Sequence, residues 1–232
     1  MATWRKAQEA DLAIARTTQQ AIVTSALPAL ESWEVETLYT PLIQVGGDVY
    51  GWRQLENGSA LFWVADATGH GIAAALFTTL VALLFNHASS GSNTAQGILA
   101  RVNAEFYSVL RGRSFMTAGC AVIETNGRLS FAGAGHPPLL LRRRGGAVET
   151  VRSLATMIGI HPGMEGAETV TTLAPGDAAL LYTDGLYSSR SDSGERLTGE
   201  HLTKEFARLG GHGDLLARLV AELAQPSKTQ AF

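Results

Sequence analysis

Apolar side chains recur at helical spacing in five stretches of the chain. The stretches are about Glu9–Leu27, Gly71–Ala88, Thr94–Leu110, Gly199–Leu209 and Asp214–Leu223. Each predicts an α-helix, because residues three and four apart lie on the same face of a helix. The first is loosely patterned and is followed by Pro28, which stops a helix. The second is apolar almost all round, so we expect it to lie between a sheet and a second helix.

Alternating or continuous apolar runs predict strands between these helices. The runs are Trp33–Tyr39, Asp48–Leu55, Ser59–Ala65, Met116–Thr125, Arg128–Ala134, Leu139–Arg144 and Ala178–Tyr182. Asn57-Gly58 and Asn126-Gly127 join successive runs, and Asn-Gly is the preferred two-residue hairpin turn because both positions tolerate positive φ. Gly145-Gly146 is placed to close a third hairpin. The hairpins predict antiparallel sheets, and the paired helices between them predict an α+β fold with helices outside.

The size and composition of the chain indicate one fold unit. It has 232 residues, 46% of them hydrophobic, which is enough for one sizeable core. No Pro/Ser-rich or charge-block segment divides it. We therefore expect an N-terminal helical lead-in or linker at residues 1–30 and a single domain at residues 31–232.

Charge and hydropathy exclude several classes of function. The net charge of −3 gives no general attraction to nucleic acid or to anionic lipid. Arg142-Arg143-Arg144 is too short a basic run to change this, and we expect it to end a strand at a solvated edge. The longest apolar stretch, Ile72–Phe85, is shorter than the roughly 20 residues that a membrane span requires. We expect neither nucleic-acid binding nor membrane insertion.

The single cysteine, Cys120, lies in an apolar strand pattern, where burial is the usual fate of a free thiol. One cysteine allows neither an internal disulfide nor a Cys-rich zinc site. No signal peptide is visible, because the N-terminal residues are polar and charged through Gln20. These features favour a cytoplasmic, reducing location.

Three aspartates stand where apolar strand-like runs break into glycine. They are Asp48 in Val45-Gly-Gly-Asp48, Asp66 in Val64-Ala-Asp66-Ala-Thr-Gly-His-Gly71 and Asp184 in Leu181-Tyr-Thr-Asp184-Gly185. A strand end fixes the direction of a carboxylate, and the nearby glycine lets backbone, ion and phosphate approach closely. Such oxygen donors suit hard divalent ions, and two ions about 3.5–4 Å apart activate a bridging water for attack on phosphorus. The pattern therefore predicts metal-dependent phosphoester hydrolysis.

Five short motifs follow one another along the chain. They are Gly46-Gly-Asp48-Val-Tyr50, Asp66-Ala-Thr-Gly-His-Gly71 with Ala73-Ala-Ala-Leu76, Ala134-Gly-His-Pro-Pro138, Pro175-Gly-Asp177 and Tyr182-Thr-Asp-Gly185. Each alone is a weak signal. Their order, over roughly Leu12 to the C-terminus, resembles that of the metal-dependent serine/threonine protein phosphatases (PPM family), specifically the bacterial sporulation stage II E-type branch.

The resemblance implies a four-layer αββα sandwich of two antiparallel sheets flanked by helix pairs. It also implies two Mn²⁺ or Mg²⁺ ions in a cleft at one end of the sheets. By this resemblance Asp66 bridges both metals, the Ala67 carbonyl binds one, and Asp184 holds the other. Asp48 binds metal directly or through waters. Asp48, Asp66 and Asp184 are thus the implied catalytic residues.

The resemblance also implies partners. Family members remove phosphate from phosphoserine or phosphothreonine, often on anti-sigma-factor antagonists of the STAS type. They commonly follow sensor domains, whose signal passes through a helix like Glu9–Leu27. We therefore expect a phosphorylated protein substrate and an upstream sensor domain. The sequence does not decide whether the protein forms a homodimer through the N-terminal helix.

The chain departs from the family pattern at its C-terminus. Family members end with an Asp-Asp-x-Thr-like strand that supplies another metal carboxylate, whereas this sequence ends Gln225-Pro-Ser-Lys-Thr-Gln-Ala-Phe232. We expect a phosphatase domain that lacks its last strand. The alternative is a catalytically impaired module of the same fold that docks a phosphoprotein or partner without hydrolysis.

Two histidines and one glycine-rich turn suggest other interpretations. His70 and His136 are candidates for protonating the leaving serine oxygen, and structural hydrogen bonding is an equal alternative for each. Gly69-His-Gly71-Ile-Ala-Ala74 has the pattern of a dinucleotide-binding turn. That fold needs an acidic residue about 20 positions further on and parallel βαβ connections. The sequence has no such residue there, and the Asn-Gly hairpins contradict the connections.

Overall fold

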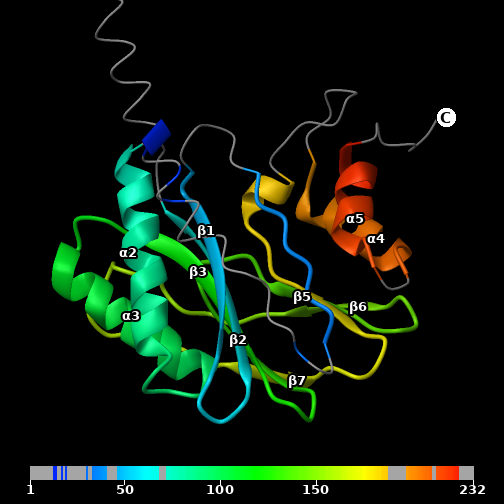
Figure 1. Cartoon of the computed structure of the whole chain (residues 1–232), viewed down its shortest axis with the longest axis horizontal. Helices are drawn as coiled ribbons and strands as arrows, with labels where there is room; N and C mark the ends of the chain where they lie inside the picture. The colour runs from blue at the N-terminus through cyan, green and yellow to red at the C-terminus, as the bar shows by residue number, and fades with distance from the viewer. Residues whose placement is uncertain are drawn as a thin grey trace, which may run out of the picture.

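The computed structural model describes residues 13, 14, 17, 19, 30, 33–40, 46–67, 72–187, 197–210 and 213–224. Two antiparallel sheets form in this part of the chain (Figure 1). The five-stranded sheet has the order β1 (Asp48–Gln54), β2 (Ala60–Ala67), β3 (Met116–Ile123), β4 (Arg128–Ala134) and β7 (Thr169–Thr172). The three-stranded sheet has the order β6 (Val148–Val151), β5 (Leu139–Arg142) and β8 (Ala178–Leu180).

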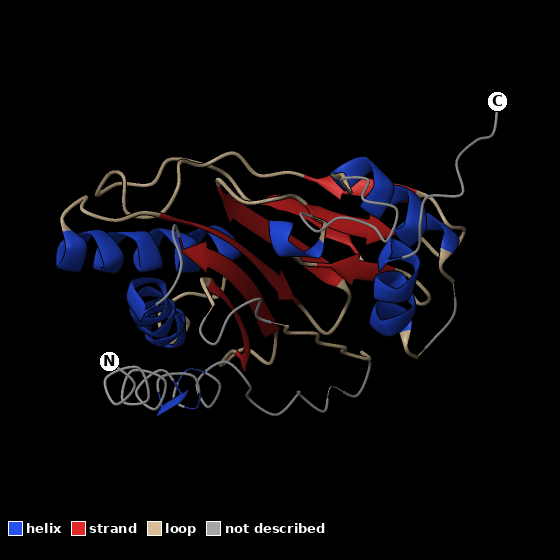
Figure 2. Ribbon diagram, turned by 90° about the horizontal axis from the view of Figure 1, so that it is seen from above, coloured by secondary structure: helices blue, strands red, loops and turns tan. Residues whose placement is uncertain are grey.

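Two pairs of helices cover the sheets, one pair on each (Figure 2). On the larger sheet, α2 (Ile72–Ala88) packs against β1 and β2, and α3 (Ala95–Leu110) packs against β3 and β4. On the smaller sheet, α4 (Gly199–Arg208) packs against β5 and β6 and against α5 (Leu215–Ala224). The predicted α+β fold with two antiparallel sheets is therefore confirmed. Antiparallel pairing of β2 with β3 also excludes the parallel connection of a dinucleotide-binding unit.

The core is continuous through β5, because this strand is buried on both faces. Leu139 and Leu141 belong to the apolar cluster between the two sheets, together with Phe131 of β4. Leu140 points the other way and belongs to the cluster under α4, together with Phe206. Successive strand residues face opposite sides, so burial on both sides explains the unbroken apolar run in the sequence.

The three predicted hairpins form, but the prediction of two-residue turns is wrong. In the first, the N–H of Gly58 donates to the carbonyl of Leu55 at 2.9 Å, and the N–H of Leu55 donates to Ser59 at 2.8 Å. Gly127 and Gly146 repeat this pattern. The three glycines have φ of 83°, 87° and 89°, and neither asparagine has a positive φ. A three-residue loop needs only one left-handed position, which glycine fills.

The predicted strand Trp33–Tyr39 is not present as a strand. After a single bridge between Leu30 and Trp33, residues 34–40 form no ladder with any described strand. The segment instead contacts α5. The Glu36 carboxylate accepts the N–H groups of Leu215 and Leu216 at 3.0 and 2.8 Å, which satisfies two free donors at the start of that helix.

The basic run at the end of β5 does not lie at a solvated edge, because β5 is the middle strand of its sheet. Arg142 is 9% exposed. The Arg143 guanidinium donates to the carbonyl of Thr172 at 2.6 Å, to Asp177 at 2.8 Å and to Glu149 at 2.7 Å. It therefore ties the β5–β6 hairpin to β7 in the other sheet. The sequence did not predict β7, whose residues include only one aliphatic side chain.

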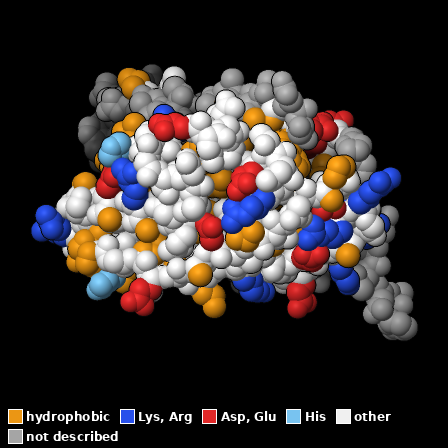
Figure 3. Space-filling model, turned by 90° about the horizontal axis from the view of Figure 1, so that it is seen from below, with side chains coloured by type: hydrophobic (Ala, Val, Ile, Leu, Met, Phe, Trp, Pro, Cys, Tyr) orange, Lys and Arg blue, Asp and Glu red, His pale blue; other side chains and the backbone are white. Residues whose placement is uncertain are grey.

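The burial of the cysteine, the helix lengths and the mixed surface charge agree with what the composition indicates. Cys120 is fully buried in β3, as predicted. No helix in the described residues is long and apolar enough to cross a membrane. Acidic and basic side chains are interspersed on the face shown in Figure 3. The helix α2 packs on the sheet beside α3, but Leu76 and Leu83 on it remain 66% and 58% exposed.

A buried glutamine joins the N-terminal part of the chain to the rest of the domain. Gln19 is 4% exposed, and its amide nitrogen donates to the carbonyl of Gly46 and to the hydroxyl of Thr78 on α2, both at 2.8 Å. The N–H of Gly46 donates back to the amide oxygen at 3.2 Å. Both main-chain polar groups of a residue two positions before Asp48 are therefore held by one side chain.

We expect the Gln19→Ala variant to lose about 1–3 kcal/mol of unfolding free energy, because it leaves the buried Thr78 hydroxyl and the part-buried polar groups of Gly46 without their partner. Urea denaturation measures this loss. Thr17→Ala is the matched control, since that hydroxyl bonds Ala13 at an exposed position of the same helix. The control should change stability by less than about 0.5 kcal/mol. Equal losses in the two variants would contradict the anchoring role of Gln19.

Candidate active site

Two of the predicted aspartates are brought together by the β1–β2 hairpin. Asp48 begins β1 and pairs directly with Asp66 near the end of β2. Residues directly opposite in an antiparallel pair point to the same face, with Cβ atoms about 4.5–5.5 Å apart. The N–H of Ala67 also donates to the carbonyl of Gly47 at 2.9 Å, which extends the pairing past both aspartates. Strand register alone therefore places these carboxylates side by side.

The third aspartate reaches the same place from the smaller sheet. Asp184 begins a short 3₁₀ helix, η1 (Asp184–Leu186), that follows β8. The hydroxyl of Thr183 donates to the Asp48 carboxylate at 3.1 Å and so joins the two sheets. A side chain at Gly185 would place its Cβ only 3.3 Å from the same carboxylate oxygen. Glycine thus allows η1 to approach Asp48 closely.

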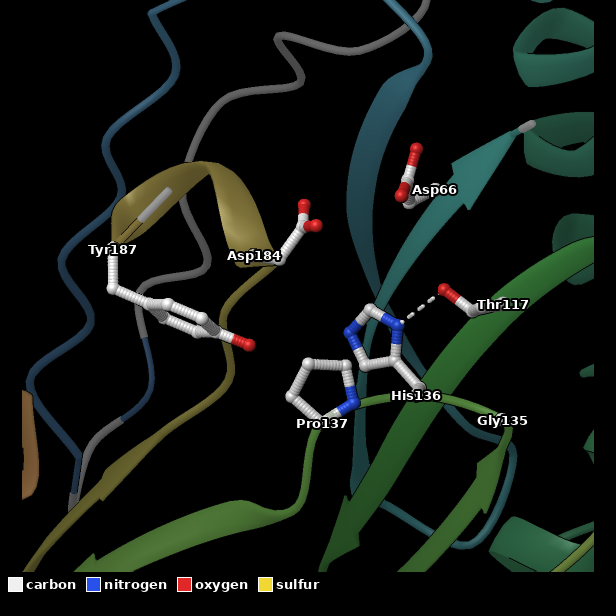
Figure 4. A pocket seen from close by; sticks show the side chains of 7 residues that line it. All are labelled: Asp66, Thr117, Gly135, His136, Pro137, Asp184 and Tyr187. Carbon is white, nitrogen blue, oxygen red and sulfur yellow. Dashed lines mark hydrogen bonds between the residues drawn. The ribbon is translucent and has the colours of Figure 1, made fainter. Parts of the chain in front are cut away.

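Asp66 and Asp184 line one cavity of about 300 Å³ (Figure 4). Their carboxylates face this space from different sheets. The remaining lining residues are Thr117, Gly135, His136, Pro137 and Tyr187. The cavity therefore lies at the end of the sheets where β2, β3, the β4–β5 loop and η1 meet.

The site carries negative charge that no described ion pair neutralises. Burial raises the pKa of Asp66 to about 6, with further contributions from the charges of Asp48 and Asp184. Burial also raises the pKa of Asp48, against the hydrogen bond from Thr183, which lowers it. One Asp48 oxygen is buried and has no hydrogen-bond partner among the described residues. This electrostatic arrangement favours a bound cation.

Side chains alone do not complete a metal shell. In the part of the chain that the structure describes, no group of three or more His, Cys, Asp or Glu side chains is arranged so that it can hold an ion. Main-chain carbonyls and water are the other oxygen ligands available to a hard cation. Thr68, His70 and Gly71 of the second motif lie outside the described residues.

His136 bridges the two sheets at the wall of the cavity. Its Nε2 lies 3.0 Å from the carbonyl of Tyr182, and its Nδ1 lies 2.9 Å from the hydroxyl of Thr117. A carbonyl only accepts, so Nε2 carries the proton and Nδ1 accepts from the hydroxyl. Burial lowers the pKa of His136 to about 4, which keeps the ring neutral near pH 7. Both nitrogens are occupied, which favours the structural alternative over proton donation.

Sequence reasoning missed the residues that hold the aspartates in place. Thr183 was visible only as the residue before Asp184, and Thr117 stands in a strand with no motif around it. Only the strand register places Thr117 opposite Asp66 and beside His136. Tyr187 and Pro137, which line the cavity, gave no separate signal either.

Comparison with protein families gives one match over most of the chain. A family model described as stage II sporulation protein E (SpoIIE) matches residues 56–231. The chain is similar to the protein IcfG of Synechocystis, with 25% identity over 83% of this chain and 35% of that protein. It is also similar to the phosphoserine phosphatase RsbP of Bacillus subtilis, with 24% identity over 76% of this chain and 45% of that protein. The chain thus spans less than half the length of these two relatives.

Among solved structures, the SiaA-PP2C domain of Pseudomonas aeruginosa is similar over 97% of this chain and 92% of that one. The TM-score is 0.81 and the sequence identity is 27%. The arrangement of sheets and helices described above is therefore that of a PP2C-like domain.

We expect acid to destabilise the protein partly through His136, since its folded pKa of about 4 lies below the unfolded value of 6.5. The unfolded chain binds the extra proton between these values, so stability falls as pH drops from 6.5 to 4, by up to about 3 kcal/mol. Urea denaturation at several pH values measures this slope. His136→Gln should flatten the slope, and an unchanged slope would contradict the assignment.

Proposed function

The chain belongs to the stage II sporulation protein E (SpoIIE) family of PPM-type serine phosphatases, and we propose that it is a Mn²⁺- or Mg²⁺-dependent protein phosphatase. Its substrate would be phosphoserine or phosphothreonine in another protein. The observation that supports this best is the cavity in which Asp66 and Asp184 meet from different sheets. Asp48 stands directly beside Asp66 in the strand register.

The residues of this chain fit a pair of hard divalent ions. We assign Asp66 and Asp184 as side-chain ligands from opposite sides of the cavity, the Ala67 carbonyl as a main-chain ligand, and Asp48 as a ligand directly or through water. All are oxygen donors, which Mg²⁺ and Mn²⁺ prefer. The unpartnered Asp48 oxygen and the raised pKa of Asp66 both indicate carboxylates that lack a positive neighbour.

Two bound ions would lower the pKa of a bridging water and neutralise charge on the phosphoryl oxygens. The task of the protein is then to hold its carboxylates in position. Thr183 fixes Asp48 through a hydrogen bond, and the neutral ring of His136 fixes the chain two residues before Asp184. Pro137 and Tyr187 line the cavity. No protein nucleophile is needed for the reaction.

We further propose that residues 31–232 form the catalytic domain, with helix pairs outside the sheets as an αββα sandwich, and that a further carboxylate-bearing strand completes it. A second candidate is a module that docks a phosphoprotein without hydrolysing it. Hydrolysis in the presence of manganese distinguishes the two.

The partners that we propose follow from the family and from one contact. RsbP is named a phosphoserine phosphatase, and we propose a STAS-type antagonist of an anti-sigma factor as the substrate here, in a cytoplasmic signalling pathway. Gln19 joins the N-terminal helix to Gly46, beside Asp48. This contact offers a route by which an upstream sensor domain, or a second copy paired through the helix, would affect the site.

Replacing Asp66 by Asn should abolish hydrolysis of p-nitrophenyl phosphate in manganese, with a loss of at least about 10²-fold in kcat/KM, because a metal carboxylate is lost. Manganese should also raise the melting temperature of the unmodified chain, and by clearly less in the variant. Without metal the variant should be at least as stable at pH 7–8, because a repelled charge is removed.

Asp214→Asn is the matched control, since Asp214 lies outside the cavity and its positive φ of 53° suits Asn equally well. The control should keep both hydrolysis and the thermal shift, and chelator should remove both. Undiminished hydrolysis by Asp66→Asn would refute the assignment. Metal binding without any hydrolysis by the unmodified chain would instead support the docking module.

A further inference from the structure

A groove of about 1080 Å³ adjoins the cavity and shares Pro137 and Tyr187 with it. It lies between α4 and the strand β6, and one end is at the β5–β6 hairpin, where Gly146 lies beside Ala207 of α4. A phosphoserine side chain needs only the smaller cavity. The groove therefore has room for several residues of a polypeptide that enters the site.

The wall formed by β6 is a sheet edge that no described strand covers. In the three-stranded sheet β6 pairs with β5, and no described strand pairs with its other side. The N–H of Arg143 donates to the carbonyl of Ala147 at 2.8 Å, and hydrogen-bonded pairs alternate in an antiparallel ladder. This register turns the main-chain groups of Val148 and Thr150 away from β5. An extended peptide can pair with such groups by strand addition.

The charged side chains of the groove favour an acidic ligand. Arg152 and Lys204 line it, together with one acidic residue, Glu200. Neither basic side chain takes part in an ion pair between described residues. Arg152 follows β6 at the end that pairs with Leu139, next to the Pro137 boundary of the cavity. A positive charge therefore stands near the entrance of a site whose own residues are negative.

We propose that this groove binds the segment of the phosphoprotein substrate next to the phosphoserine, as an extended strand on this edge of β6 with acidic side chains toward Arg152 and Lys204. The inference rests on the proposed function and deepens it, because it names the substrate as a phosphoserine in an acidic, extended segment. Main-chain pairing provides binding, and the two basic residues provide the preference for sequence.

The test compares two phosphoserine peptides, one with aspartates and one with lysines on both sides of the phosphoserine, and p-nitrophenyl phosphate. The double variant R152E/K204E should lower kcat/KM for the aspartate peptide about tenfold, mainly through KM. It should raise kcat/KM for the lysine peptide. It should change kcat/KM for p-nitrophenyl phosphate by less than about twofold, because the aryl phosphate is too small to reach the groove. R101E, on α3, is the matched control and should change none of the three.

The strand edge is tested separately at Thr150, whose N–H points away from β5. Thr150→Pro removes that donor without breaking the pairing with β5. It should weaken the binding of both peptides. Thr150→Val keeps the N–H and should leave the binding of both peptides unchanged. Circular dichroism and melting temperature establish that both variants fold.

Binding of the fluorescently labelled aspartate peptide to the chelator-treated chain, followed by anisotropy, gives a readout without hydrolysis. Weaker binding to R152E/K204E than to R101E is expected. Equal binding, or equal changes for the two peptides, would overturn the groove assignment even if hydrolysis is intact. Failure of the unmodified chain to hydrolyse any substrate would refute the proposed function, while the anisotropy result would still decide on the groove.

Discussion

Like-charged carboxylates held together in a partly buried cavity are the constraint on which the rest of the structure depends. Asp48 and Asp66 are fixed as neighbours by strand register, and Asp184 approaches them from the other sheet. Burial, with a further contribution from neighbouring carboxylates, raises the pKa of Asp66 and Asp48, which is unfavourable for folding near neutral pH. Such an arrangement is stable only if the surrounding fold is rigid, and it becomes favourable when a cation binds.

The rigidity comes from polar links between the two sheets at both ends of their apolar interface. At the cavity end, Thr183 bonds Asp48, and His136 lies between Thr117 and the carbonyl of Tyr182. Near the opposite end, Arg143 reaches from the β5–β6 hairpin to the carbonyl of Thr172 in β7. Between these links the sheets are held by apolar packing, and hydrophobic contacts are not directional. The polar contacts therefore fix how the two sheets are aligned.

The same geometry connects the cavity with its surroundings. On one side Gln19 holds both main-chain polar groups of Gly46, two residues before Asp48. On the other side Pro137 and Tyr187 separate the cavity from the groove along β6. The cavity therefore lies between the segment that Gln19 anchors and the groove along β6.

The sequence by itself determined the helices α2 to α5, most strands, the hairpins, the α+β class and the three aspartates, because periodicity and glycine-flanked strand ends are local properties. The sequence wrongly predicted a strand that includes residues 34–39, and it did not predict β7. Strand pairing depends on which strand lies alongside and not on the local pattern. Only the tertiary structure decided that His136 is a neutral bridge, that Thr183 and Thr117 support the site, and that no described strand pairs with the outer side of β6 beside the cavity. These features arise from contacts between segments distant in the chain, and neither spacing nor composition encodes such contacts.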